Sequence, residues 1–166
     1  MAEIMIGGSP ANTSGNLPNI GSKGPGFTLT KTDLSDISLP DLAGKRVVLN
    51  IFPSIDTPVC SASVRRFNRE AAALTNTRVL SVSADLPFAH KRFCETEGIE
   101  GVIAVSELRT RGFGDAYGVR IAEGPLEGLL ARAVVVLDEE GTVIYSSFAK
   151  DLKEEPPYDE ILASLA

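Results

Sequence analysis

The sequence predicts an α/β fold in which a central mixed β-sheet is flanked by helices. Two nearly continuous apolar runs, at 46–52 and 133–137, are typical of strands buried on both faces. Helical patterns follow the strand-like segments in the first part of the chain, as they do in βαβ units. The tight turn at 138–141 joins the run at 133–137 to an apolar segment at 142–148, which predicts an antiparallel hairpin.

The N-terminal part contains two short strand-like segments, Glu3 to Ile6 and Phe27 to Thr30, separated by residues typical of turns. We interpret them as a small β-hairpin, and residues 1–30 as a peripheral extension of a single domain that spans residues 1–166. The order of the remaining elements is found in thioredoxin-like folds. They are expected as a strand at 36–39, a strand at 46–52, a helix after residue 57, a strand at 78–83, a helix at 85–97, a strand at 102–105, a short helical pattern within 106–117, the hairpin at 133–148 and a helix at 156–165.

The composition bounds the class of protein and its partners. With 166 residues and 43% apolar residues, the chain is long enough for one domain with a substantial core. A net charge of −6 argues against nucleic acids and anionic membrane surfaces as partners, because both attract basic patches. The N-terminus lacks the pattern of a signal peptide and no apolar stretch approaches membrane-spanning length, so we expect a cytoplasmic protein.

The stretch from Leu49 to Asn68 runs from a strand through a proline-bracketed turn into a helix, and we place the chemistry in that turn. Asp56 or Thr57 is the expected N-cap, and Pro58 occupies the first helical turn. Cys60 therefore lies where backbone N–H groups have no partner within the helix. Those donors and the helix dipole favour a nucleophilic thiolate.

Pro53, Thr57 and Cys60 together form a cup that can shield the sulfur and offer hydrogen bonds to a small oxygenated substrate. Their Pro-x-x-x-Thr-x-x-Cys spacing resembles the signature of the peroxiredoxins. The longer run FPSIDTPVC, followed by SVRRFN, is similar to the bacterial thiol peroxidase subgroup. The likeness extends over nearly the whole chain, through ISLPDLAGKRVVLN, SADLPFAHKRFC and YGVRIAEGPLEGLLARAVVVLDEEG.

The resemblance implies a peroxidase that reduces hydrogen peroxide and organic hydroperoxides, with alkyl and lipid hydroperoxides among the latter, without flavin, haem or metal. It implies that Cys60 is oxidised to a sulfenic acid and that Cys94 resolves it as an intramolecular disulfide, which thioredoxin then reduces. It also implies a homodimer. Each of the two cysteines is expected on its own helix, so the disulfide requires local unwinding unless the helices converge.

Arg132 is expected beside Cys60, because in such a fold the first hairpin strand runs antiparallel to the strand that delivers the cysteine. Its guanidinium can then stabilise the thiolate and donate hydrogen bonds to peroxide oxygens. Peroxiredoxins place an arginine at the corresponding strand, and the resemblance assigns that role to Arg132. Taken alone, Arg132 is equally explained as a charge that borders a hydrophobic strand.

Other interpretations of the two cysteines remain open at this stage. Cys60 can be a buried core residue, and Cys94 can fill a gap near the end of its helix. Cys60-Ser61-Ala62-Ser63 has the Cys-x-x-Ser pattern of monothiol disulfide oxidoreductases, and a non-catalytic redox sensor could use the same disulfide. His90 and Cys94 also have the spacing of metal ligands on a helix, although further ligands are missing.

Overall fold

The computed structural model describes residues 1–166 and contains a seven-stranded mixed sheet with a separate two-stranded one. The strand order in the large sheet is β4-β3-β7-β6-β5-β8-β9, with β5, β6 and β7 parallel and the other pairs antiparallel. The strands are β1 (Glu3–Ile6), β2 (Ser9–Asn12), β3 (Thr28–Lys31), β4 (Asp36–Ser38), β5 (Arg46–Ile51), β6 (Thr77–Ser83), β7 (Ile103–Ser106), β8 (Ala133–Leu137) and β9 (Val143–Phe148).

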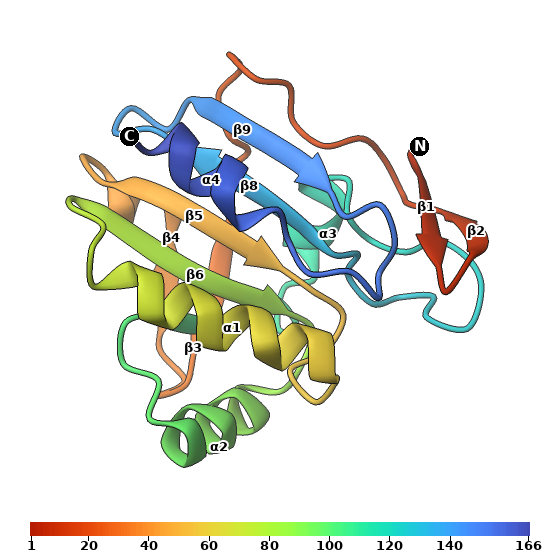
Figure 1. Cartoon of the computed structure of the whole chain (residues 1–166), viewed down its shortest axis with the longest axis horizontal. Helices are drawn as coiled ribbons and strands as arrows, with labels where there is room; N and C mark the ends of the chain where they lie inside the picture. The colour runs from red at the N-terminus through yellow and green to blue at the C-terminus, as the bar shows by residue number, and fades with distance from the viewer.

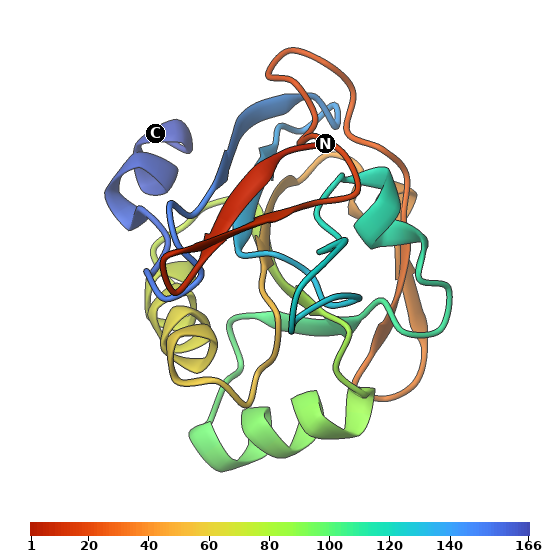
Figure 2. The same cartoon turned by 90° about the vertical axis from the view of Figure 1, so that its right-hand side faces the viewer.

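The helices cover both faces of the large sheet. Helices α1 (Pro58–Ala71) and α4 (Tyr158–Ser164) lie on one face, and α3 (Gly112–Ala116) lies on the other (Figures 1 and 2). Helix α2 (Pro87–Glu97) packs against β7, and a short 3-10 helix, η1 (Leu39–Leu42), precedes β5. None of the helices combines the length and the apolar character that crossing a membrane requires.

Strand β5 separates two apolar clusters because its side chains alternate between the faces of the sheet. Val47, Leu49 and Ile51 belong to the cluster on the α3 side. Val48 and Phe52, the residue after the end of β5, belong to the cluster beneath α1 and α4. The continuous apolar run at 46–52 is thus a strand buried on both faces, as predicted. The mixed sheet with flanking helices confirms the predicted fold class.

The predicted composition of the N-terminal hairpin is wrong. Strand β1 pairs with β2, whose register places Ile6 opposite Ser9, and the tight turn uses two glycines with positive φ, Gly7 and Gly8. Strand β3, which contains most of the expected second hairpin strand, instead lies between β4 and β7 in the large sheet. Leu29 is only 1% exposed. Residues 27–30 are therefore part of the core sheet, and the peripheral hairpin ends at Asn12.

Several other predicted elements are confirmed with small changes in their bounds. Helix α1 begins after its N-cap, Thr57, and α2 ends at Glu97, before Gly98, whose positive φ of 66° is typical of a glycine that caps a helix. Strands β8 and β9 form the predicted hairpin. The helical pattern within 106–117 yields only the five residues of α3. In the last predicted helix, Ile161 and Leu165 are buried, whereas Tyr158 and Leu162 are half-buried.

Candidate active site

Cys60 lies in the first turn of α1, where the chain has just left the end of β5. Thr57 has the extended backbone of an N-cap, and Pro58 opens the helix, so the local sequence favours a helix start at this point. The thiol is free and fully buried in the cluster beneath α1. Ser63 fixes the same turn, because its hydroxyl donates to the Cys60 carbonyl at 2.7 Å and accepts from the amide of Asn50 on β5 at 3.1 Å.

Arg132 brings a positive charge to this buried sulfur. Strand β8 runs antiparallel to β5 and pairs Ala133 with Ile51, so the residue before β8 lies at the end of β5 from which the Cys60 loop departs. The Arg132 Nη2 atom donates to Cys60 Sγ at 3.1 Å, and its Nε donates to the Leu152 carbonyl at 3.0 Å. The side chain is 2% exposed, and Nη1 is buried without a partner. A cation in this position stabilises a negative charge on the sulfur.

Pro53 and Thr57 lie in the turn before α1, but their side chains differ in environment. Pro53 is buried, whereas Thr57 is exposed. The Thr57 hydroxyl donates to the Ser54 carbonyl at 3.0 Å rather than accepting a hydrogen bond from a backbone N–H of α1. The Thr57 backbone N–H also donates to that carbonyl, at 3.2 Å, because the turn brings the two residues together. The predicted N-cap position is confirmed, and the expected capping bond is absent.

Asp85 holds the loop that precedes Cys60, which the sequence did not reveal. Its carboxylate accepts hydrogen bonds from the Ser54 hydroxyl at 2.9 Å, from the Ile55 backbone N–H at 2.8 Å and from the Ser83 hydroxyl at 2.5 Å. In the sequence, Asp85 indicated only the beginning of a helix. An acidic residue at the end of a strand was the one available signal, and it does not say which loop the carboxylate reaches.

Cys94 lies on α2, separately from Cys60 on α1. Its thiol is free and half-buried, and it packs against the same apolar cluster that contains Cys60. Burial, with a smaller contribution from Glu95, raises the pKa of the Cys94 thiol above its ordinary value. In this arrangement the sulfur of Cys94 is therefore held protonated at neutral pH, while the sulfur of Cys60 faces a guanidinium.

A polar groove of about 250 Å³ separates α1 from α2. Two ion pairs cross it, Arg65 with Glu97 at 2.7 Å and Arg92 with Asp56 at 2.5 Å. The Arg65 guanidinium also lies 5.5 Å from the centre of the Phe93 ring. These contacts attach α2, which bears Cys94, to α1 and to the turn before it. The groove is lined by Ile55, Asp56, Ser61, Arg65, Arg92, Phe93, Thr96 and Glu97.

His90 does not act with Cys94 as the sequence spacing of metal ligands suggested. Its Nε2 atom lies 2.9 Å from the Ser83 hydroxyl, and its side chain is almost fully buried. No group of three His, Cys, Asp or Glu side chains in the chain is arranged to hold a metal ion.

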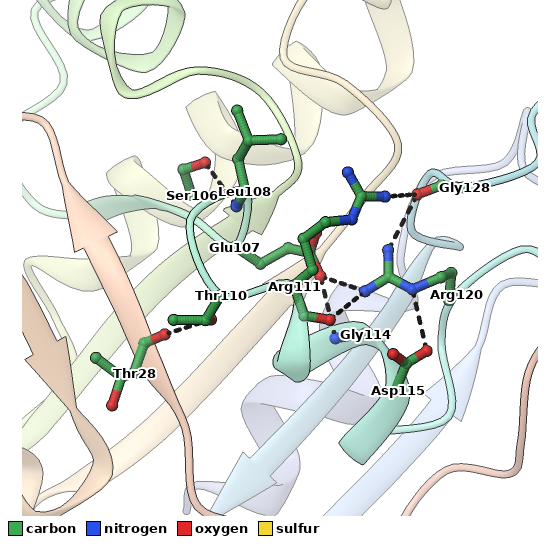
Figure 3. A network of polar contacts seen from close by, with 10 residues as sticks. All are labelled: Thr28, Ser106, Glu107, Leu108, Thr110, Arg111, Gly114, Asp115, Arg120 and Gly128. Carbon is green, nitrogen blue, oxygen red and sulfur yellow. Dashed lines mark hydrogen bonds and ion pairs between the residues drawn. The ribbon is translucent and has the colours of Figure 1, made fainter.

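A second polar network holds the segment that leads to Arg132 (Figure 3). The buried Glu107 carboxylate accepts from Arg120 Nη2 at 2.6 Å and from the Gly114 backbone N–H at 3.2 Å. Arg120 also donates to the Gly128 carbonyl at 3.1 Å and to Asp115 at 3.0 Å. The network joins the β7–α3 turn to residues 118–130, which run directly into the strand that begins beside Arg132.

Comparison with known proteins agrees with this geometry. The Redoxin family matches residues 19–162. The chain is 52% identical to a thiol peroxidase of Mycobacterium bovis, over 99% of both chains. Its fold is similar to a peroxiredoxin-like protein from Aquifex aeolicus, with a TM-score of 0.94 and 36% identity over 99% of this chain and 96% of that one.

A thiol peroxidase from Chromobacterium violaceum has the same fold, with a TM-score of 0.89 and 23% identity over 97% of this chain and 93% of that one. At this identity the likeness concerns the fold alone. The enzyme class follows from the Mycobacterium bovis relative, which is 52% identical over 99% of both chains. A buried cysteine at a helix start, an arginine in contact with its sulfur and a family match over most of the chain lead to one assignment: this protein belongs to the redoxin family and is a thiol peroxidase of the peroxiredoxin type.

Proposed function

We propose that the enzyme reduces hydrogen peroxide and organic hydroperoxides through Cys60. The Cys60 thiolate attacks the terminal oxygen of the hydroperoxide, the O–O bond breaks, and the leaving oxygen takes a proton to give water or an alcohol. Cys60 is thereby oxidised to a sulfenic acid. The observation that carries this proposal is the 3.1 Å contact between Arg132 Nη2 and Cys60 Sγ in a buried site.

Arg132 has the donors that this reaction needs. One of its nitrogen atoms faces the sulfur and one is bound by the Leu152 carbonyl. The third, Nη1, has no partner in the structure and can donate to a peroxide oxygen as charge develops on it. Pro53, buried in the turn, limits the access of water to the sulfur, and the hydroxyl of the exposed Thr57 is proposed to turn from the Ser54 carbonyl to the substrate.

Cys94 is proposed to resolve the oxidised cysteine. Its sulfur attacks the sulfenic acid of Cys60, which forms the Cys60–Cys94 disulfide and releases water. Because the cysteines lie on separate helices and burial raises the pKa of Cys94, we propose that the end of α2 and the first turn of α1 unwind before this step. Unwinding exposes Cys94 to water, which lowers its pKa and speeds the attack.

The disulfide is proposed to be reduced by the dithiol of thioredoxin, which becomes a disulfide in turn. Without such a reductant the enzyme would stop after one turnover. We therefore propose that it works in the cytoplasm, where thiol reductants are maintained, and contributes to antioxidant defence. A homodimer is proposed from the family resemblance.

The test is peroxide consumption by the reduced enzyme in the presence of thioredoxin, thioredoxin reductase and NADPH. The unmodified chain is expected to turn over continuously. Cys60→Ser is expected to lose peroxide reduction altogether, and Cys94→Ser is expected to reduce one equivalent of peroxide and then stop. Mass spectrometry of the oxidised unmodified chain should find Cys60 bonded to Cys94.

Other outcomes would contradict the proposal in distinct ways. Stoichiometric oxidation of the unmodified chain without turnover would favour a redox sensor. Sustained turnover by Cys94→Ser with thioredoxin would mean that thioredoxin reduces Cys60 directly and that Cys94 has no resolving role.

Thr57→Val should slow the oxidation of Cys60 by roughly tenfold to a hundredfold, because it removes the hydroxyl that we propose turns from the Ser54 carbonyl to a peroxide oxygen. Thr57→Ser keeps the hydroxyl and is expected to react at nearly the rate of the unmodified chain. The rate is measured by mixing the reduced enzyme with peroxide, quenching, and counting the remaining thiols. Equal rates for the valine and serine variants would show that Thr57 acts only on the turn.

A further inference from the structure

We propose that His90 is the positioning residue that docks α2 onto the body of the enzyme, and that its protonation releases α2 and thereby Cys94. The docking part of this inference stands on the geometry alone. The part that concerns Cys94 rests on the resolving role proposed above.

His90 is the one buried residue among the eleven residues of α2. Its ring is 1% exposed and meets the Phe52 ring edge to face, with centroids 6.3 Å apart. Its Nε2 atom lies 2.9 Å from the hydroxyl of the fully buried Ser83 at the end of β6. The remainder of α2 is half-buried or exposed, so this side chain makes the deepest contact between the helix and the sheet.

The hydrogen bonds around Ser83 determine which ring nitrogen carries the proton. Ser83 donates its hydroxyl hydrogen to the Asp85 carboxylate at 2.5 Å, so its oxygen accepts from His90 Nε2–H. The other ring nitrogen, Nδ1, is then a bare acceptor, and it is buried without a partner. A second proton on the ring would create a charged N–H with no acceptor. The docked position therefore selects the neutral imidazole.

The same network links α2 to the Cys60 loop. Asp85 binds Ser83 with one carboxylate oxygen, and with its two oxygens it also holds Ser54 and Ile55 in the turn before α1. Cys94 follows His90 by four residues, which places both side chains on one face of α2. Withdrawal of His90 therefore loosens the helix at the position of Cys94 and disturbs the support of the Cys60 loop.

The two ion pairs that join α2 to α1 and to the turn before it are weaker than the buried contact of His90. The side chains of Arg92 and Asp56 are 63% and 61% exposed, and those of Arg65 and Glu97 are 41% and 34% exposed. Ion pairs with this exposure are screened by water and contribute little to docking. Ala89, Phe93 and Cys94 of α2 also pack against the apolar cluster beneath α1, but they are only partly buried, whereas His90 is the buried side chain of the helix.

Burial lowers the pKa of His90 to about 4, although the charges of Asp85 and Asp56 act in the opposite direction. Arg92 is the nearby cation, and it is paired with Asp56. In the released helix the imidazole regains its ordinary pKa of about 6.5. Because the docked pKa is depressed, docking of α2 is fully stable above pH 6.5 and weakens as the pH falls from 6.5 towards 4.

The sole histidine of the chain makes a direct test possible. In the reduced, untagged enzyme, the imidazole signal in NMR spectra is expected to titrate near pH 4, as burial of His90 requires. In the Cys60–Cys94 disulfide form it should titrate near the ordinary value, about 6.5. A histidine that titrates near 6.5 in the reduced enzyme would overturn the proposal, as would an unchanged pKa in the disulfide form.

Hydrogen exchange of the α2 amides in the reduced enzyme tests release without any peroxidase chemistry. After correction for intrinsic exchange, opening of α2 is expected to increase about tenfold between pH 7.5 and pH 5.5. His90→Gln keeps a hydrogen-bonding group but cannot gain a proton in this range, so its opening should not depend on pH. Lys91→Gln removes an exposed charge from the same helix, at a side chain that is 58% exposed, and should behave as the unmodified chain does.

The link to Cys94 has its own readout. The rate of disulfide formation is measured in the unmodified chain and in His90→Gln. Ionisation of Cys94 affects both proteins equally and cancels when the rate of the unmodified chain is divided by that of His90→Gln. This ratio is expected to be about tenfold higher at pH 5.5 than at pH 7.5. A flat ratio together with the predicted exchange would overturn the link to Cys94. Failure of disulfide formation in both proteins, with the predicted exchange, would instead overturn the resolving role of Cys94. Equal pH dependence of exchange in the two proteins would overturn the docking role of His90.

Discussion

Replacing Arg132 by methionine is expected to slow the oxidation of Cys60 by hydroperoxide by about 10²- to 10³-fold. Removing one preorganised donor from a site of developing negative charge commonly has an effect of this size. Arg132 is in addition a cation in contact with the Cys60 sulfur at 3.1 Å, and it is only 2% exposed, so water replaces little of its effect. The methionine side chain retains most of the apolar stem and fills a similar volume.

The rate should be measured by competition with a second peroxidase of known rate, because the chain has no tryptophan to report oxidation by fluorescence. Arg132→Lys is the matched variant, since it keeps the charge but cannot bond the sulfur and the Leu152 carbonyl with one planar group. It is expected to react at an intermediate rate. Urea unfolding is the control. A buried cation without a carboxylate partner contributes little to the free energy of unfolding, so Arg132→Met should be as stable as the unmodified chain. A normal oxidation rate for Arg132→Met would remove the guanidinium from the mechanism.

Glu107→Gln is expected to lower the free energy of unfolding by about 3 kcal/mol. The carboxylate is fully buried and binds the Arg120 guanidinium, which is 14% exposed. Removing one partner of such a pair leaves the other charge uncompensated in a poorly solvated place, at a cost of about 3 to 5 kcal/mol. We expect the lower end of this range, because Arg120 keeps its contacts with Asp115 and with the Gly128 carbonyl.

Urea denaturation of the reduced enzyme measures this effect. Asp115→Asn is the matched control, since Asp115 binds the same guanidinium but is 65% exposed, and it should change the unfolding free energy by less than about 1 kcal/mol. Because the network in Figure 3 holds residues 118–130, Glu107→Gln should also loosen the approach to Arg132 and reduce peroxidase activity. Equal stability of the two variants would mean that the buried pair contributes no more than the exposed one.

Local sequence was informative wherever the structure depends on neighbouring residues. Thr57 and Pro58 predicted the start of α1, and the helix expected at 85–97 ends at the same residue as α2. The turn at 138–141 predicted the β8–β9 hairpin, because such a turn leaves the two strands adjacent. Arg132 was placed beside Cys60 through the assumed pairing of β8 with β5 and through the family resemblance, not through its own neighbours in the sequence.

The pairing of the N-terminal strands was not predictable in the same way. Segments 3–6 and 27–30 have equally short strand patterns, and a pattern of four residues does not identify its partner strand. The tight turn at Gly7 and Gly8 leaves β1 and β2 adjacent, so these two strands pair. Leu29 instead packs in the apolar cluster on one face of the large sheet. Burial of apolar surface then decided that β3 joined β4 and β7.

The sequence by itself determined that a cysteine begins a helix after a buried strand, because caps, prolines and apolar periodicity act over a few residues. Tertiary structure alone decided that Asp85 supports the Cys60 loop, that Glu107 faces Arg120 and that His90 is buried against Ser83. These contacts join separate elements, and a polar side chain has the same sequence signature whether it faces water or a buried partner. Only the packing of helices and strands around a polar side chain excludes water from it, and the side chain then needs a hydrogen-bonding partner within the protein.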